Sequence, residues 1–95
     1  MIRKAGDADG IDEGLRGLVD TARSDLAGRL GIAPEDIAPV SATAVVWPDA
    51  ALGCRLPDMR YKQVPVDGAL IELRANGRLY RYHSGGSRPP FLCDR

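Results

Sequence analysis

The sequence predicts an α+β fold in which one N-terminal amphipathic helix packs on an antiparallel sheet of about four strands, giving two layers. Two patterns predict it: apolar residues at helical spacing between positions 11 and 30, and a strand hairpin between positions 69 and 83. With 95 residues, the chain is long enough for one domain with a modest core. We expect a flexible arm over residues 1–10, a single domain over residues 11–95, and a monomer.

The expected helix runs from about Asp12 to Leu30. Apolar residues recur three and four positions apart along it, and charged residues fill the opposite face. Acidic residues at its start suit the positive end of the helix dipole, and Gly31 favours the left-handed backbone that ends many helices. Because Gly14, Gly17 and Gly28 lower the helix propensity, we expect packing on the sheet to hold this helix.

Three further segments have the pattern of strands, at residues 38–47, 69–75 and 78–83. The last two are separated by Asn76-Gly77, the preferred pair for a two-residue type I′ turn. This turn sets Leu70 opposite His83 and Glu72 opposite Arg81, which predicts a cross-strand ion pair worth about 0.2–1 kcal/mol. The core side of the hairpin then consists of Ile71, Leu73, Tyr80 and Tyr82. Residues 85–90 are expected to form a loop, and residues 91–93 a short last strand.

The segment between the first strand and the hairpin, residues 48–67, is the most distinctive part of the chain. Together with Trp47, the only Trp, it contains one of the two Cys and three of the seven Pro. We expect it to form a long, stiff loop, and rigid loops bind with less ordering cost. The candidate binding residues are Trp47, Asp49, Leu52, Arg55, Leu56, Met59 and Tyr61.

Composition and charge exclude several classes of function. Residues 1–36 carry five basic and eight acidic side chains, and residues 37–95 carry eight and five, so the net charge is zero. A nucleic-acid-binding surface is normally denser in basic residues and interleaved with aromatic ones, so we expect no nucleic acid. No apolar run approaches the roughly 20 residues of a membrane span, and the first residues lack the apolar core of a signal peptide. We therefore expect no membrane insertion.

Cys54 and Cys93 are the only cysteines, 39 positions apart. We expect them to form a disulfide, which the chain-entropy estimate values at about 4 kcal/mol. They could instead be two inert buried thiols, or one of them could be reactive. Two Cys and one His are too few for a structural zinc site at recognisable spacing, so no metal and no cofactor are expected.

His83 is the only histidine and raises the question of catalysis. A thiol-dependent hydrolase would need Cys54 and His83 within hydrogen-bond reach, with a third group orienting the imidazole. The simpler interpretation of His83 is a residue at a strand end opposite Leu70. Because few catalytic groups are present and each has a structural explanation, we expect no enzyme.

Several of these residues together resemble a family of small bacterial domains of unknown function. The shared features are a W-P-D-x-x-L-G-C-P motif over residues 47–55, a Tyr-x-Tyr-His strand over residues 80–83, and a late Cys at position 93. The resemblance covers most of residues 18–93. Similar sequences are often exported, which favours the disulfide. The chain departs from the pattern at Arg55, which stands where the motif has Pro.

The function expected from the sequence is a non-enzymatic binding module whose partner is another protein. It could be a protease inhibitor, with Arg55-Leu56 lying in the protease cleft like a substrate, or an accessory protein of the envelope or of a secreted assembly. The alternative is the small thiol-dependent hydrolase. We expect export to the periplasm, envelope or medium if the disulfide forms, and a cytoplasmic location otherwise.

Overall fold

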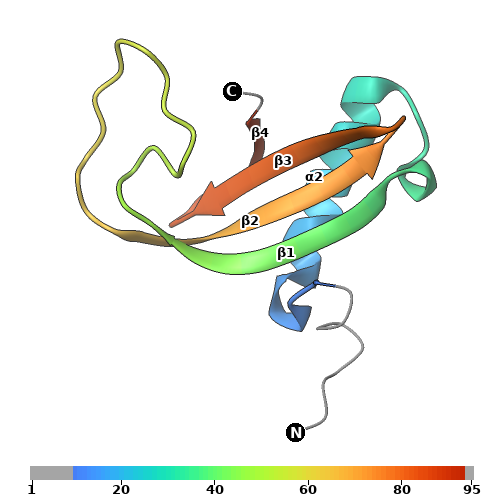
Figure 1. The fold of residues 1–95 in the computed structure, drawn as a ribbon, viewed down its shortest axis with the longest axis horizontal. Coiled ribbons are helices and arrows are strands. Elements are labelled where there is room, and N and C mark those ends of the chain that lie inside the picture. The colour runs from blue at the N-terminus through green and yellow to red at the C-terminus, as the bar shows by residue number, and fades with distance from the viewer. Residues whose placement is uncertain (1–9, 94–95) are drawn as a thin grey trace, which may run out of the picture.

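The computed structural model describes residues 10–93, so the predicted arm lies outside the described residues except for Gly10. The helical elements are the 3₁₀ turn η1 (Glu13–Leu15), the helix α2 (Arg16–Leu30) and the 3₁₀ turn η2 (Pro34–Asp36). The strands are β1 (Ala38–Trp47), β2 (Val66–Ala75), β3 (Arg78–Gly85) and β4 (Arg88–Cys93). The connection from β1 to β2 extends beyond one end of the sheet (Figure 1).

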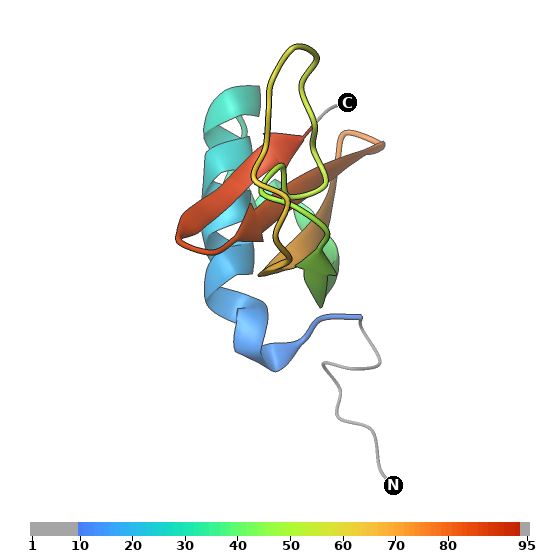
Figure 2. The same cartoon turned by 90° about the vertical axis from the view of Figure 1, so that its left-hand side faces the viewer.

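The four strands form one antiparallel sheet in the order β1-β2-β3-β4, and α2 packs on one face of it (Figure 2). This arrangement confirms the predicted α+β fold. The core between the two layers includes Val19, Ala22 and Leu26 from the helix and Ala42, Ile71, Leu73 and Tyr82 from the sheet. Within residues 10–93, no helix has both the length and the hydropathy that crossing a membrane requires.

The helix begins four residues later than predicted, because a 3₁₀ turn precedes it. Asp12 starts this turn, and its side chain accepts a hydrogen bond from the amide of Gly14 at 2.9 Å. The predicted end is confirmed at Gly31, which has a φ of 67° and donates its amide hydrogen to the carbonyl of Ala27.

Polar side chains join α2 to the sheet beside the core. The hydroxyl of Tyr82 donates a hydrogen bond to Asp25 at 2.7 Å, and Arg29 donates to the same carboxylate oxygen at 2.6 Å. The hydrogen bond from Arg29, followed by that from Tyr82, lowers the pKa of Asp25. Burial, followed by the bond to Asp25, raises the pKa of Tyr82. This cluster therefore favours an ionised Asp25 and a neutral Tyr82.

The predicted hairpin is confirmed residue by residue. Asn76 and Gly77 have φ angles of 54° and 76°, as a type I′ turn requires. Glu72 lies opposite Arg81, and Leu70 lies opposite His83. The predicted ion pair joins Arg81 Nε to Glu72 Oε2 at 2.9 Å.

The sheet differs from the prediction at β4, which begins at Arg88 rather than at residue 91. The predicted loop over residues 85–90 is reduced to a turn at Gly86 and Ser87. Pro89 and Pro90 are accommodated because β4 is an edge strand and the pairing register shifts opposite them. The interpretation of these prolines as loop residues was therefore wrong.

Candidate functional site

The loop between β1 and β2 covers residues 48–65, two residues shorter than predicted because β2 begins at Val66. Its first part, up to Cys54, folds back over the face of the sheet opposite α2. There the side chains of Ala51 and Leu52 are buried, with exposures of 1% and 3%. We call residues 47–54, together with His83 and Cys93, the loop base.

Two parallel rings form the centre of the loop base. The Trp47 indole lies on the His83 imidazole with ring centroids 4.8 Å apart and an interplanar angle of 5°. The indole Nε1 donates a hydrogen bond to the carbonyl of Ser84 at 2.8 Å. A Cβ atom on Gly53 would lie 2.4 Å from the indole and one on Gly68 2.5 Å from it, so both positions need glycine. The end of β1 is thereby held against β3.

His83 also holds the loop backbone in place. Its Nδ1 lies 2.6 Å from the carbonyl oxygen of Leu52, so Nδ1 carries the hydrogen and donates it. The imidazole is buried, with an exposure of 7%. Its observed contacts are therefore those of a structural residue, stacked on Trp47 and bonded to Leu52.

The predicted disulfide closes the loop base. Cys54 and Cys93 are bonded with an S–S distance of 2.04 Å, and their Cα atoms are 6.0 Å apart. The bond ties the loop to the end of β4. In this structure Cys54 therefore has no thiolate to offer as a nucleophile.

Asp49 and Arg55 stabilise the loop from within. One carboxylate oxygen of Asp49 accepts a hydrogen bond from the amide of Ala51 at 2.9 Å, and the other pairs with Arg55. The Arg55 guanidinium lies over the Tyr61 ring, 5.2 Å from its centroid. The Tyr61 hydroxyl accepts a hydrogen bond from the amide of Leu56 at 3.1 Å. Arg55, the departure from the resembled motif, thus links the two limbs of the loop.

Residues 56–64 make up most of the remaining loop and are mostly exposed, and we call them the loop crown. It contains three of the most exposed large apolar side chains of the described residues: Leu56 at 46%, Met59 at 54% and Val64 at 49%. A tight turn forms its tip, because the amide of Met59 donates to the carbonyl of Leu56 at 3.4 Å and Asp58 has a φ of 67°. Arg60 and Lys62 follow, and both are exposed.

The seven predicted binding residues separate into two groups. Arg55, Leu56 and Met59 are exposed, and Tyr61 is half-buried beneath Arg55. Trp47 and Asp49 are half-buried in the loop base, and Leu52 is buried there. Binding by any of them stays a prediction.

Sequence reasoning did not single out Val64, Arg60 and Lys62 in the crown or the stacking of His83 on Trp47. The crown residues could have been found as apolar and basic residues beside the predicted binding residues. The stacked pair could not, because 36 positions separate its members and only the tertiary fold brings them together.

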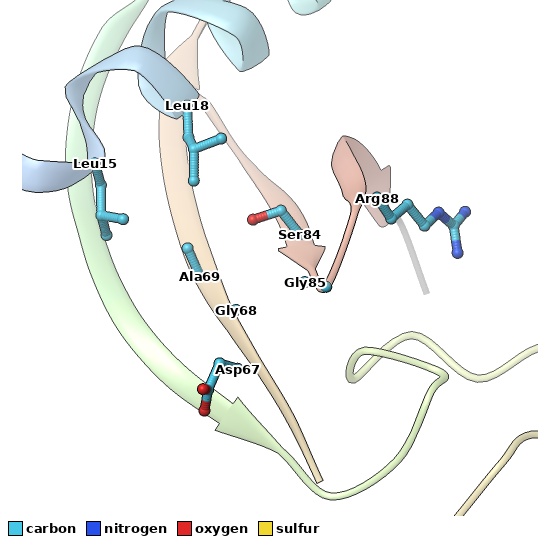
Figure 3. A pocket seen from close by; sticks show the side chains of 9 residues that line it. Leu15, Leu18, Asp67, Gly68, Ala69, Ser84, Gly85 and Arg88 are labelled. Atoms are coloured by element: carbon cyan, nitrogen blue, oxygen red, sulfur yellow. The ribbon is translucent and has the colours of Figure 1, made fainter. Parts of the chain in front are cut away.

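A concave surface lies on the α2 side of the sheet, at the end where β2 begins (Figure 3). It is an open hollow of about 280 Å³, with Leu15 and Leu18 on one wall and Gly68, Ala69 and Ser84 below them. Arg88 stands at its rim, but its guanidinium lies 3.7 Å from the centroid of the Phe91 ring. Within residues 10–93, no three His, Cys, Asp or Glu side chains are grouped to hold a metal ion.

Fold and site together define a small α+β domain that presents one long loop, closed at its base by a disulfide and a stacked Trp–His pair. Residues 19–93 match the family described as Domain of unknown function (DUF8738). The chain belongs to this family. No curated protein and no solved structure matched the chain. The expectation of a small domain of uncharacterised function is thus confirmed.

Proposed function

We propose that this protein is a non-enzymatic binding module that holds another protein through the loop crown, residues 56–64. One observation carries the proposal: exposed apolar side chains stand on a loop whose base is fixed by a disulfide, a ring stack and side-chain hydrogen bonds. Exposing Leu56, Met59 and Val64 to water lowers solubility, and burying them against a partner recovers that free energy.

The anchoring of the loop makes the crown suitable for binding. A loop that is ordered before it meets its partner loses little conformational entropy on binding. The Asp49–Arg55 pair and the Tyr61 hydroxyl limit the motion of the tip without covering Leu56 or Met59. Arg60 and Lys62 add positive charge beside the apolar side chains. The proposed partner surface is therefore apolar and bordered by carboxylates.

The disulfide supports a place outside the cytoplasm for this activity. Disulfides persist in oxidising compartments and are rare in the cytosol of most organisms. We therefore propose an exported protein of the periplasm, the envelope or the medium, acting as an accessory to a larger assembly or as an inhibitor of a protease. In the inhibitor form, Leu56 is the side chain free to enter a pocket, since Arg55 is paired with Asp49.

The test compares two variants that place the same charge at similarly exposed positions. Leu56→Asp changes the crown, and Val46→Asp changes β1, where Val46 is 65% exposed. Each protein is offered to an envelope extract and, at micromolar concentration, to trypsin-like, chymotrypsin-like and subtilisin-like proteases. We expect a partner whose affinity for purified Leu56→Asp is at least tenfold weaker than for the wild type and for Val46→Asp. A partner that binds all three equally, or no partner and no inhibition, contradicts the proposal.

The alternative, a thiol-dependent hydrolase, is tested by counting thiols. The protein is prepared without reductant and titrated both folded and denatured. We expect no free thiol in either state, because Cys54 and Cys93 are paired. Two thiols that react in the folded state would favour the hydrolase and make Cys54→Ser the first variant to assay.

A further inference from the structure

We propose that β1 pairs with β1 of a second copy of this chain, antiparallel, about a twofold axis at Val45. The inference is independent of the function proposed for the loop crown. It also departs from the monomer that the sequence led us to expect. It rests on the outer edge of β1 at Ala44 and Val46.

The outer edge of β1 is half covered in the single chain. β1 is an edge strand, with β2 on its inner side (Figure 1). At Ala42 the outer side is occupied, because its amide donates to the carbonyl of Gly10 and its carbonyl accepts from the amide of Asp12. Ile11 forms the corresponding parallel bridge.

Beyond Ala42 the edge is open. Successive residues of a strand direct their peptide groups to alternate sides, and Ala42 directs its groups outward. The register of β1 on β2 is regular from Ser41 to Trp47, so Ala44 and Val46 also direct theirs outward. Among residues 10–93, these outward groups have no backbone or side-chain partner. The strand ends at Trp47, and the next residue, Pro48, has no amide hydrogen to donate.

The short open window suits a copy of itself. In antiparallel pairing centred on Val45, Ala44 lies opposite Val46 of the second copy, and Val46 lies opposite its Ala44. Each of these two pairs exchanges both of its hydrogen bonds, which gives about four in all. The covered residue Ala42 of one copy then comes opposite Pro48 of the other, where that strand has already ended. The limits of the window therefore coincide in the two copies.

Side-chain chemistry also favours a second copy. Residues 38–47 contain no charged side chain, so β1 meets itself without like-charge repulsion. Edge strands of proteins that stay monomeric are commonly protected by charges, prolines or bulges, and the window at Ala44 and Val46 has none of these. Val46, the most exposed of the large apolar residues at 65%, would pack beside the small Ala44 of the second copy. Two sheets of four strands would join into one of eight.

The first test is the mass in solution as a function of concentration, by light scattering and sedimentation. A window this short predicts a weak dimer, so we expect the apparent mass to rise from one chain toward two as the concentration increases from micromolar to millimolar. Val46→Lys should keep the protein monomeric throughout this range. Val64→Lys, the same change at an exposed valine of the loop crown, should dimerise as the wild type does. A wild type that stays monomeric at millimolar concentration, or a Val46→Lys variant that dimerises equally, overturns the proposal.

The second test detects the axis itself. In the proposed register Val45 lies opposite its own copy, with Cα atoms about 4.5 Å apart, which is within disulfide range. Thr43 projects from the same face, but it lies roughly 13 Å from its counterpart, four residues along the strand. Under mild oxidation we expect Val45→Cys to form a covalent dimer at least tenfold faster than Thr43→Cys. Equal rates of covalent dimer formation in the two variants overturn the register. If neither variant forms a covalent dimer, the pairing of β1 with itself is overturned.

Discussion

Glycine at position 68 shows how a single residue decides whether the loop base can form. Gly68 lies on β2 between Val45 and Gly85 of the neighbouring strands. A Cβ atom there would lie 2.0 Å from the carbonyl oxygen of Ser84 and 2.5 Å from Nε1 of Trp47. These two atoms are the acceptor and the donor of the hydrogen bond that holds the indole. Because Gly68 has no side chain, the Trp47 indole can occupy this space.

Replacing this glycine should destabilise the protein, whereas the same change in the helix should not. We expect Gly68→Ala to lower the free energy of unfolding by about 1–3 kcal/mol, as overpacking typically does, and to alter the Trp47 fluorescence. Gly28→Ala adds the same methyl group to an open site on α2. It should raise the free energy of unfolding by up to about 1 kcal/mol through helix propensity. Urea unfolding of both variants checks this, and a Gly68→Ala protein as stable as the wild type would contradict it.

Among the elements, α2 is held by the sheet rather than by its own sequence. Its buried face contains Val19, Ala22, Leu26 and Ala27, and a Cβ atom added at Gly17 or Gly28 would meet no other atom within 4 Å. Beside this apolar contact, the Tyr82 hydroxyl and Arg29 share the Asp25 carboxylate. Glycines lower the helix propensity of α2, and isolated helices of this length are marginal in water. The helix therefore needs both the apolar contact and the hydrogen bonds to Asp25.

Removing the Tyr82 hydroxyl should change both the stability and its pH dependence. We expect Tyr82→Phe to lower the free energy of unfolding by about 1 kcal/mol at neutral pH, the usual value of one hydrogen bond. Because the pKa of Tyr82 is raised in the folded protein, its stabilisation is complete below about pH 10. It is lost as the pH rises further, since the unfolded chain releases this proton first. Between pH 8 and 11, the free energy of unfolding should therefore fall more steeply with pH for the wild type than for Tyr82→Phe. Equal pH dependence in the two proteins would count against the Tyr82–Asp25 bond.

The same cluster predicts the acidic side of the stability curve. The pKa of Asp25 is lowered in the folded protein, so its contribution is present above about pH 4, the ordinary range of a carboxyl group. It disappears as the pH falls below that range. We expect Asp25→Asn to reduce the steepness of acid unfolding between pH 4 and pH 2. An unchanged acid transition in this variant would show that ionisation of Asp25 adds no stability to the folded protein.

In the molecule as a whole, the disulfide connects the loop that follows one edge strand, β1, to the end of the other edge strand, β4. Cys54 belongs to the loop after β1, and Cys93 ends β4 on the far edge of the sheet. Together with the stacked Trp47 and His83, the bond makes the loop base a cover for the sheet face that α2 does not reach. A domain of 95 residues buries a modest core, so this constraint matters for its stability.

Removing both sulfur atoms should loosen the loop before it unfolds the sheet. We expect the double variant Cys54→Ser, Cys93→Ser to lose up to about 4 kcal/mol of unfolding free energy, the chain-entropy value for this spacing. Its circular dichroism at low temperature should remain that of the wild type, whereas limited proteolysis should now cleave within residues 55–64. Equal stability and equal protease resistance in the two proteins would mean that the loop base is held without the bond.

The helix and the hairpin of β2 and β3 can be predicted from the sequence alone. Apolar spacing located α2, and Asn76-Gly77 fixed the register of β2 on β3 because a two-residue turn permits only one alignment. With only two cysteines in the chain, the Cys54–Cys93 bond was the preferred of three interpretations, and the resemblance supported it. These features can be predicted from short stretches of sequence, because they depend on neighbouring residues or on a very small number of possible partners.

The packing of the folded domain fixes which loop residues face water and which face the protein. Seven residues of one segment were predicted as candidate binding residues, yet Leu52 is buried while Leu56 and Met59 are exposed. The extension of β4 through Pro89 and Pro90, and the open edge of β1 beyond Ala42, were equally outside the reach of the sequence. Each depends on contacts between segments far apart in the chain, such as His83 on Trp47 and Gly10 on Ala42. Such contacts are fixed by the packing of the whole domain and leave no local periodicity to find.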